Sequence, residues 1–391
     1  MTRILYLAHD LDDPATGRRV SMLETGGAVV DLVGFRRGTA PLGRPARVLG
    51  QTYNGRFVQR AWSAAQVLRH AKEIAEGDAP DVILVRSLEM LPLAQRVRSM
   101  FGRHHRPRMI YEVLDVHRLM VGTGAVSSAM RFIERRLCRN VDRVVVSSMR
   151  FTDEYLHRYR QIGSVPILVE NKFWDPSQAE TVPQAPPLTQ AEDGTLTIGW
   201  FGILRCAASL QCLDEVCRRA DGRIKLVLRG KPALDSIPDF HRIVQDNPHI
   251  AFHGPYTYPD DLAAIYREID IAWLIDRMDA GANSDWLLPN RLYESGAHGV
   301  VPLALAGTET GQYLSRANLG LLLHELDADH VSDCLDGVDQ ARLGQLRAQV
   351  AAKGAAAWRM THADCIRLVN VLAGRRTTAT DAATQAVEVA G

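Results

Sequence analysis

Residues 196–229 read LTIGWFGILRCAASLQCLDEVCRRADGRIKLVLR and decide the fold class of this chain. An apolar run at 196–201 is followed by a helical pattern at 210–219 and by a second apolar run at 224–229. Short buried strands that alternate with amphipathic helices are typical of βαβ units, whose strands are parallel. The segment therefore predicts an α/β fold built on a doubly wound parallel sheet.

The same alternation continues on both sides of this segment. Before it, strands are predicted at 3–8, 28–34, 81–86, 108–113, 143–147 and 166–169. After it, strands are predicted at 249–253, 269–275, 300–305 and 319–323. The segment 327–372 is predicted to be helical, with a break near Gly354. Two Rossmann-like domains that face a central cleft are the expected architecture.

Composition shifts set the expected boundaries between the parts of the chain. A proline-containing stretch interrupts the alternation and has no hydrophobic pattern of its own, so it predicts a linker. The last residues contain few large apolar side chains, which indicates a disordered tail. We expect an N-terminal domain at 1–170, a linker at 171–195, a C-terminal domain at 196–350, a C-terminal helix at 351–374 that has the option of returning to the N-terminal domain, and a tail at 375–391.

The overall composition excludes several classes of protein. The 391 residues include 46 Lys and Arg against 45 Asp and Glu, and 46% are hydrophobic, so disordered, collagen-like and disulfide-rich chains are excluded. The opening MTRILYLAHDLDDP carries acidic residues where a signal peptide needs an apolar run, and no run of ~18 apolar residues follows. The six cysteines form no CxxC pair, which favours reduced thiols. We therefore expect a cytoplasmic protein.

The formal net charge of +1 hides an asymmetry between the two halves. Residues 1–170 contain 26 basic and 17 acidic residues, whereas residues 171–391 contain 20 basic and 28 acidic residues. The halves are therefore expected to meet different partners.

Candidate ligand-binding residues follow the predicted strands, because open α/β sheets bind ligands at the carboxyl ends of their strands. Gly202 and Arg205 follow the strand at 196–201, and Lys231 follows Gly230 after the strand at 224–229. Glycine allows close approach of the backbone, and the cations suit a diphosphate. Plain turns with surface cations are the alternative interpretation.

The segment at 286–302, WLLPNRLYESGAHGVVP, carries the most specific pattern. Pro289 lies near the start of a predicted helix, Asn290 and Arg291 lie in its first turn, and Glu294 lies three residues beyond Arg291 on the same face. A cation for a phosphate and a carboxylate for a ribose diol at one helix N-terminus are suited to a nucleotide. An exposed Arg291–Glu294 pair is the alternative.

This segment resembles the P-x-[KR]-x-x-E-x-x-A-x-G-x-P block of GT-B glycosyltransferases, particularly the family-4-like enzymes of bacterial exopolysaccharide synthesis. Further segments resemble the family in the same order along the chain. They lie at 1–11, 80–85, 142–148, 169–171 and 253–272. The segment YEVLDVHR at 111–118 resembles succinoglycan-type sugar transferases in particular.

The resemblance implies a C-terminal domain that binds a nucleotide sugar and an N-terminal domain that receives the acceptor. By position, Glu294 would hold the ribose, Arg205 and Arg291 the diphosphate, and His253 and Gly254 would border the base. The chain departs from the family at Trp286, where retaining relatives carry a second acid, with Asp285 and Asp279 nearby. It departs again at Ala207 and Ala208, where a second cation is expected, and Lys231 is the candidate substitute.

The candidate catalytic residues belong to the predicted N-terminal domain. An inverting transferase needs a carboxylate base near the acceptor hydroxyl, and Asp115 is the preferred candidate, with Glu112 and His117 next. A retaining enzyme would use the leaving diphosphate and need His117 only to orient the sugar. Helix capping or local pairing with Arg118 is the alternative. The DLDD sequence at 10–13 lies in the predicted N-terminal domain and not in the domain expected to hold the donor diphosphate, so neither a metal nor another cofactor is expected.

Arginines at 131, 135 and 139 recur every four residues and predict one basic helix face. Arg131, Arg135 and Arg139 would suit an anionic membrane surface that carries a lipid-diphosphate acceptor. Nucleic acid is the other partner that a basic face suits, but no nucleic-acid recognition motif supports it. A solvated helix face is the remaining alternative.

We expect a glycosyltransferase at the cytoplasmic face of the inner membrane, which transfers a hexose from a nucleotide sugar, UDP-glucose as the first choice, to a lipid-linked saccharide in exopolysaccharide biosynthesis. Two alternatives stay open. The first is a nucleotide-sugar epimerase with the same fold, and the second is an inactive homologue with a regulatory or scaffolding role, which Trp286 favours.

Overall fold

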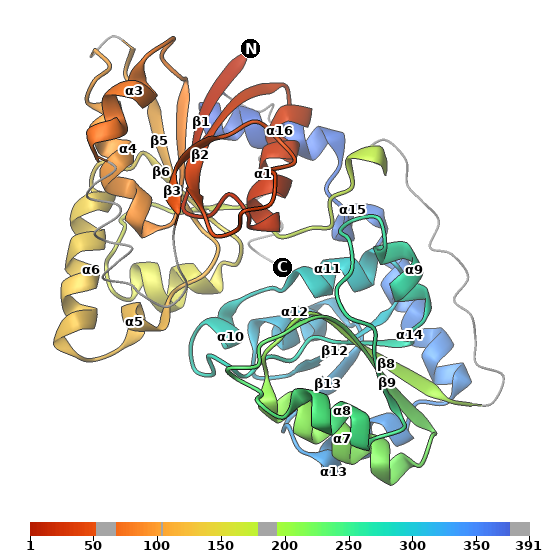
Figure 1. The fold of residues 1–391 in the computed structure, drawn as a ribbon. Helices are drawn as coiled ribbons and strands as arrows, with labels where there is room; N and C mark the ends of the chain where they lie inside the picture. The colour runs from red at the N-terminus through yellow and green to blue at the C-terminus, as the bar shows by residue number, and fades with distance from the viewer. Residues whose placement is uncertain (52–67, 103–104, 179–193, 376–391) are drawn as a thin grey trace. The chain divides into compact units, whose positions relative to one another are not determined.

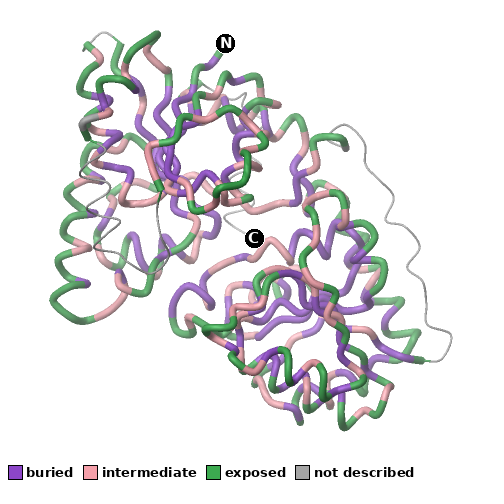
Figure 2. The backbone as a smooth tube through the Cα atoms, viewed as in Figure 1, coloured by how far each residue is buried: buried purple, intermediate pink, exposed green. Residues whose placement is uncertain are grey.

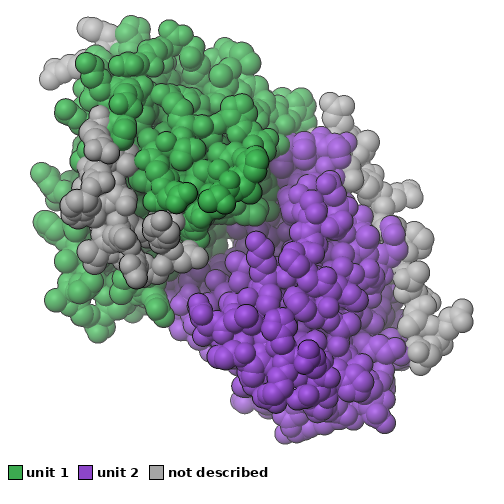
Figure 3. Space-filling view, viewed as in Figure 1, with its two compact units in different colours: residues 1–170, 361–391 green, residues 171–360 purple. Residues whose placement is uncertain are grey.

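The computed structural model describes residues 1–51, 68–102, 105–178 and 194–375. The chain forms two compact units (Figure 3). Unit 1 consists of residues 1–170 and 361–391, and unit 2 consists of residues 171–360. Unit 2 is therefore inserted into the sequence of unit 1.

Unit 1 contains a seven-stranded parallel sheet in the order β3-β2-β1-β4-β5-β6-β7. Its central strands are almost wholly buried, because their apolar side chains are covered on both faces (Figure 2). The strands are β1 (Thr2–Ala8), β2 (Ala28–Arg36), β3 (Arg47–Gln51), β4 (Val82–Arg86), β5 (Arg108–Val113), β6 (Arg143–Val146) and β7 (Ile167–Leu168).

The helices of unit 1 follow local capping signals. Asp13 caps the first helix by accepting a hydrogen bond from the amide of Ala15 at 2.9 Å, and Pro14 occupies the first turn. The described helices are α1 (Pro14–Thr25), η1 (Leu68–His70), α3 (Ala71–Ala75), η2 (Leu88–Met90), α4 (Leu91–Arg98), α5 (Arg118–Val121), α6 (Ala125–Cys138), the π-helix η4 (Thr152–His157) and α16 (His362–Ala373).

Helix α16 is part of unit 1 although unit 2 precedes it in the sequence. It lies beside α1 (Figure 1), where Gly26 allows close contact because a Cβ at this position would lie 2.3 Å from the Cys365 carbonyl oxygen. Arg108 donates to the carbonyl of Leu372 at 3.0 Å, at the negative end of the α16 dipole. Thr361 and Asp364 form a capping box at the other end.

Unit 2 contains a six-stranded parallel sheet in the order β10-β9-β8-β11-β12-β13. Two hydrophobic clusters cover the sheet, and they include the buried rings of Trp200, Trp273 and Tyr266. The strands are β8 (Leu196–Leu204), β9 (Ile224–Pro232), β10 (Ile250–Phe252), β11 (Ile271–Trp273), β12 (Val301–Leu305) and β13 (Leu321–Leu323).

The described helices of unit 2 connect these strands and continue beyond them. They are η5 (Pro176–Gln178), α7 (Ala207–Ala220), α8 (Phe240–Asp246), α9 (Leu262–Arg267), α10 (Asn283–Trp286), α11 (Asn290–Ala297), α12 (Glu309–Ala317), α13 (Ala328–Asp336), α14 (Gln340–Ala352) and α15 (Ala355–Trp358). No helix in the described ranges is long and apolar enough to cross a membrane.

The two parallel α/β sheets confirm the predicted fold class, and several local predictions differ from the structure. The predicted break near Gly354 is present, with Gly354 at φ 74°, but Asp339 and Thr361 also cap new helices, so the segment 327–372 forms four helices. Strand β3 was not predicted. Phe173 and Trp174, at the start of the predicted linker, are buried in unit 2, whereas residues 179–193 and the tail beyond 375 lie outside the described part of the chain.

Candidate functional site

Three glycines lie close together near the carboxyl ends of three neighbouring strands of unit 2. Gly202 in β8 and Gly230 in β9 are paired in register, and the Gly230 amide donates to the Gly254 carbonyl, after β10, at 2.7 Å. Gly230 adopts φ 125°, and a Cβ there would lie 1.8 Å from the Gly202 carbonyl oxygen. The three backbones therefore approach one another in a way that side chains would prevent.

The predicted cations Arg205 and Arg291 lie around one carboxylate, that of Asp276. Arg205 follows β8, and its Nε lies 2.7 Å from Oδ2 of Asp276, which follows β11. Arg291, in the first turn of α11, donates to the Phe201 carbonyl at 3.4 Å. Burial lowers the pKa of Arg291, Asp276 opposes this effect, and the neighbouring Arg205 lowers the pKa further. The two guanidinium groups therefore lie together at the N-terminal end of α11, which also favours an anion.

Glu294 lies one turn further along α11 and is only 4% exposed. The hydroxyl of Tyr266, from α9, donates to its Oε2 at 3.1 Å. An exposed Arg291–Glu294 pair is therefore not what the structure shows. Glu294 is a buried carboxylate on the same helix as the cation Arg291.

The other predicted donor-site residues lie at the same end of the sheet. Lys231 follows Gly230 in β9 and is exposed. His253 follows β10, is exposed, and donates its backbone amide to Leu228 at 3.0 Å. Asn290 is the first residue of α11. The structure thus places all of these predicted residues at the carboxyl ends of β8, β9 and β10 or at the start of α11.

The loop before α11 contains acidic residues, and at least one of them forms hydrogen bonds within the loop. Trp286 ends α10 and is buried. Asp285 pairs with Arg277 at 3.1 Å and accepts from the Gly281 amide at 2.7 Å, so it holds the loop together. Asp279 donates its amide to the Ser284 hydroxyl at 3.0 Å.

Sequence reasoning missed two residues of this site. Asp276 directly follows the predicted strand at 269–275, so the rule that placed Arg205 could also have selected it. Tyr266 lies within a segment that carried the resemblance, but no spacing links it to Glu294, 28 residues later. Only the packing of α9 against α11 brings the two together.

Glu112, one of the three predicted catalytic residues, is a structural residue. Its carboxylate is 1% exposed and accepts from Arg19 Nε at 2.7 Å and from the Tyr6 hydroxyl at 2.8 Å. Burial raises its pKa, but Arg19 and Arg86 outweigh burial and lower it overall. A carboxylate that is enclosed and held in its ionised form by two arginines is unsuited to accept a substrate proton.

Asp115 and His117 follow β5 and are exposed. His117 caps α5, where its Nδ1 accepts from the Leu119 amide at 3.2 Å, so the capping alternative describes this histidine. Asp115 keeps the placement that a base for an acceptor hydroxyl needs, at the carboxyl end of a central strand.

The predicted basic face of α6 divides into two kinds of arginine. Arg131 donates to the carbonyls of Met120 and Gly122 at 2.8 and 2.7 Å and lies 4.5 Å from the ring centre of Tyr159, so its role is structural. Arg135 is exposed and donates to the Tyr159 carbonyl at 2.9 Å. Arg139 is exposed at the C-terminal end of the helix.

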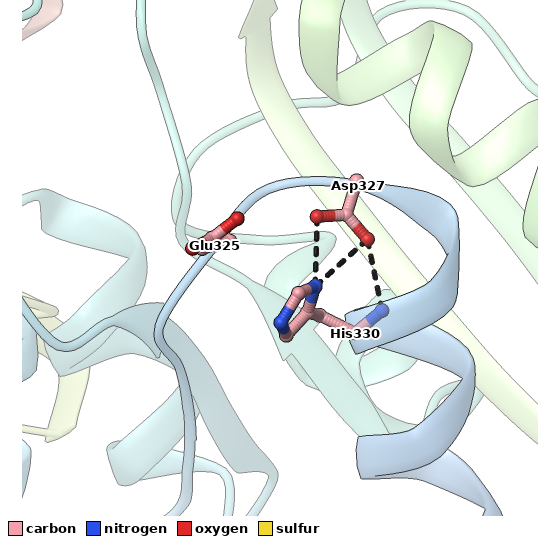
Figure 4. A group of neighbouring side chains, drawn as sticks. All are labelled: Glu325, Asp327 and His330. Atoms are coloured by element: carbon pink, nitrogen blue, oxygen red, sulfur yellow. Dashed lines mark hydrogen bonds and ion pairs between the residues drawn. The ribbon is translucent and has the colours of Figure 1, made fainter.

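One cluster of potential metal ligands occurs among the described residues, at the surface of unit 2. It consists of Glu325, Asp327 and His330 (Figure 4). Asp327 caps α13 through the His330 amide at 2.9 Å, and its carboxylate also contacts the imidazole at 2.8 Å. These hydrogen bonds raise the pKa of His330. Helix capping accounts for the arrangement of Asp327 and His330.

Comparisons with known proteins identify the family and the fold of the chain. The chain is 39% identical over 379 residues to the succinoglycan biosynthesis protein ExoL of Rhizobium meliloti (strain 1021), which covers 95% of this chain and 94% of ExoL. Sucrose-phosphate synthase from Thermosynechococcus elongatus matches with a TM-score of 0.72 at 13% identity, over 95% of this chain and 98% of that one. HepE of Anabaena in complex with UDP-glucose matches with a TM-score of 0.63 at 14% identity, over 94% and 98%. No protein-family model matches the chain.

The two parallel-sheet units have the fold of the GT-B glycosyltransferases. Within that fold class, the chain belongs to the family of the succinoglycan biosynthesis protein ExoL.

Proposed function

We propose that the protein is a hexosyltransferase of exopolysaccharide biosynthesis, which transfers glucose from UDP-glucose to a lipid-linked saccharide. The observation that carries the donor assignment is the grouping of Arg205, Arg291 and the buried Glu294 at one end of the unit 2 sheet. HepE, a structural neighbour at 14% identity, is a UDP-glucose complex, which supports the choice of nucleotide and sugar.

Each residue has a defined role in this proposal. The Glu294 carboxylate accepts hydrogen bonds from the ribose hydroxyls, while Gly254 and His253 border the base. Arg205, Arg291 and Lys231 neutralise the diphosphate, whose negative charge increases as the sugar bond breaks. Asn290 lies at the N-terminus of α11, which favours an anion there. Asp115 takes the proton from the acceptor hydroxyl.

Donor binding tests this proposal most directly. UDP and UDP-glucose should raise the melting temperature, and a ligand at 100 times its Kd adds about 2.7 kcal/mol to the stability of the folded state. GDP and dTDP sugars are measured in the same way, because they are the alternative donors. Glu294→Ala should reduce the UDP shift and abolish the transfer, whereas Asp115→Asn should abolish transfer and keep the full shift. Equal shifts with GDP-glucose would contradict the choice of UDP.

The proposal assigns the diphosphate charge to arginine and lysine side chains and requires no metal ion. Glucosyl transfer should therefore continue in EDTA. Loss of transfer in EDTA that Mg²⁺ or Mn²⁺ restores would contradict this assignment.

We also propose that α6 of unit 1 contacts the anionic membrane that holds the acceptor. Val126, Phe132 and Ile133 are 64%, 65% and 48% exposed, so three exposed large apolar side chains lie on this one helix. Arg135, Arg136 and Arg139 are exposed on the same helix, whose one acid, Glu134, is buried. Apolar side chains that insert beside arginines suit an anionic lipid surface.

Vesicle sedimentation tests this contact. The protein should bind phosphatidylglycerol vesicles more strongly than phosphatidylcholine vesicles, and the double change Phe132→Ser and Ile133→Ser should weaken that binding. Val48→Ser, at an exposed apolar residue of β3, is the matched control and should leave it unchanged. Equal binding by all three proteins would contradict a role for α6.

A further inference from the structure

Tyr266 is a buried residue that contacts the proposed donor site without being one of its predicted members. It lies in α9, is 1% exposed, and its hydroxyl donates to Oε2 of Glu294 at 3.1 Å. Tyr266 and Glu294 belong to different helices, separated by β11 and the loop with α10. The hydrogen bond therefore fixes the Glu294 carboxylate relative to an element outside its own helix.

Two aromatic contacts hold the Tyr266 ring in place. The ring of Phe201 meets it edge-on, with 5.1 Å between centroids and a 75° angle between planes. The imidazole of His298 stacks on it at 5.3 Å and 13°. Phe201 belongs to β8 and His298 ends α11, so the position of the phenol is fixed by a strand and a helix that both carry donor-site residues.

The protonation states of this group suit a fixed hydrogen bond. Burial raises the pKa of Tyr266 well above its usual value, and the Glu294 charge raises it further. The phenol therefore keeps its proton and acts as a donor throughout the physiological range. Burial and the Arg359 charge lower the pKa of His298 to about 4, so the imidazole that stacks on the phenol is neutral.

We propose that Tyr266 is a positioning residue that orients the Glu294 carboxylate toward the ribose diol of the donor. The inference rests on the proposed function, because it assigns a specificity to the same site. A carboxylate on a flexible side chain loses rotational freedom when it binds a diol, and a hydrogen bond already made to one oxygen reduces that loss. Tyr266 therefore contributes to recognition of the ribose and not to recognition of the base or the diphosphate.

Calorimetric binding of UDP and of 2′,3′-dideoxy-UDP separates these contributions. The unchanged protein should prefer UDP, because only UDP carries the diol. Tyr266→Phe removes the hydroxyl and keeps the ring, and it should weaken UDP binding by about fivefold to tenfold. Its affinity for dideoxy-UDP should stay within about twofold of the unchanged protein, since one hydrogen bond carries the effect.

Three further proteins complete the design. Glu294→Ala should remove the preference for UDP, and adding Tyr266→Phe to it should have no further effect, because the two residues act through one contact. Tyr258→Phe is the matched control, since it removes a tyrosine hydroxyl that bonds to the backbone of Trp174 in the same unit. It should keep the full preference. Tyr266→Met replaces Tyr266→Phe if the phenylalanine variant lacks the far-ultraviolet circular dichroism of the unchanged protein.

The outcomes distinguish this inference from the proposed function. If the unchanged protein fails to bind UDP, or binds UDP and dideoxy-UDP equally, the proposed donor site is wrong. If it prefers UDP and Tyr266→Phe keeps that preference, the role of Tyr266 is overturned. The role is also overturned if Tyr266→Phe weakens both ligands equally, because that result indicates a general structural effect.

Discussion

Ser87 adopts a backbone conformation that favours glycine. It follows β4 with φ 78° and ψ 153°. In this region the backbone of a residue with a side chain is strained by roughly 1–3 kcal/mol. Its Oγ is buried and has no hydrogen-bond partner among the described residues. We therefore expect Ser87→Gly to stabilise unit 1 by about 1 kcal/mol, once the larger entropy of glycine in the unfolded chain is subtracted. Urea unfolding measures this change.

Ser99→Gly is the control for that prediction. Ser99 ends α4 with φ −68° and ψ −15°, where glycine brings no relief, and its hydroxyl donates to the Arg96 carbonyl at 2.7 Å. This change should lower stability slightly. A loss of stability in both variants would show that the Ser87 backbone is not strained in solution.

Single residues also show what sequence patterns can and cannot predict. The positions of Arg205, Arg291 and Glu294 followed from the rule that sites form at the carboxyl ends of parallel strands. The environments of Glu112 and Arg131 did not follow from any pattern. Glu112 contacts Tyr6 and Arg131 contacts Tyr159, and no regular spacing in the sequence links either pair. A charged residue near a strand end can face solvent or a buried counter-ion, and only the packing decides between them.

Helix α6 is joined to its neighbours by a buried carboxylic acid. Glu134 is 2% exposed and accepts hydrogen bonds from Tyr111 of β5, at 3.1 Å, and from Tyr155 of η4. Burial raises its pKa to about 7, while the two phenols act in the opposite direction. No basic side chain in the described residues forms an ion pair with it, and Cys138 is a further titratable neighbour. Its protonated form is therefore stabilised by folding.

The stability of unit 1 should consequently depend on pH through Glu134. The pKa of the carboxyl is about 7 in the folded chain against its usual 4.5, so this contribution is fully present below about pH 4.5. It is lost as the pH rises through about 7, by at most about 1.4 kcal/mol per pH unit. Glu134→Gln should remove this dependence, and urea unfolding at pH 5, 6, 7 and 8 measures it.

Glu76→Gln, at an exposed acid after α3, is the control for this prediction and should keep the pH dependence of the unchanged protein. If Glu134→Gln and the unchanged protein lose stability in parallel between pH 5 and 8, then Glu134 is ionised in the folded chain at pH 5.

At the scale of elements, the sequence predicted buried strands better than helix ends. Strands such as β4 and β12 are continuous apolar runs, and a fully buried parallel sheet requires such runs. The break at Gly354 in 327–372 was predicted, but the two breaks at Asp339 and Thr361 were not, because the caps there compete with a continuous hydrophobic pattern. Strand β3 is exposed at a sheet edge and gives only a weak pattern.

The whole molecule consists of two units with net charges of opposite sign, and unit 1 is formed by two separate segments of the chain. Residues 1–170 carry an excess of basic residues, and residues 361–391 contain as many basic as acidic residues. Unit 1 therefore keeps the positive excess that suits an anionic surface. Unit 2 is acidic, so its proposed diphosphate site depends on a few placed cations and not on overall charge.

Because α16 completes unit 1, a chain that ends at Met360 should lose stability in unit 1 alone. Cys365, Leu368, Val369 and Leu372 are buried in α16, and each large apolar side chain contributes about 1.5–3 kcal/mol. Five of the six tryptophans lie in unit 2, so tryptophan fluorescence reports mainly on unit 2 and far-ultraviolet circular dichroism on both units. In urea, the chain Met1–Met360 should lose circular dichroism earlier while its fluorescence midpoint stays unchanged. The chain Met1–Arg375, which keeps α16, should match the full chain. An equal fall of both midpoints in Met1–Met360 would show that the units unfold as one.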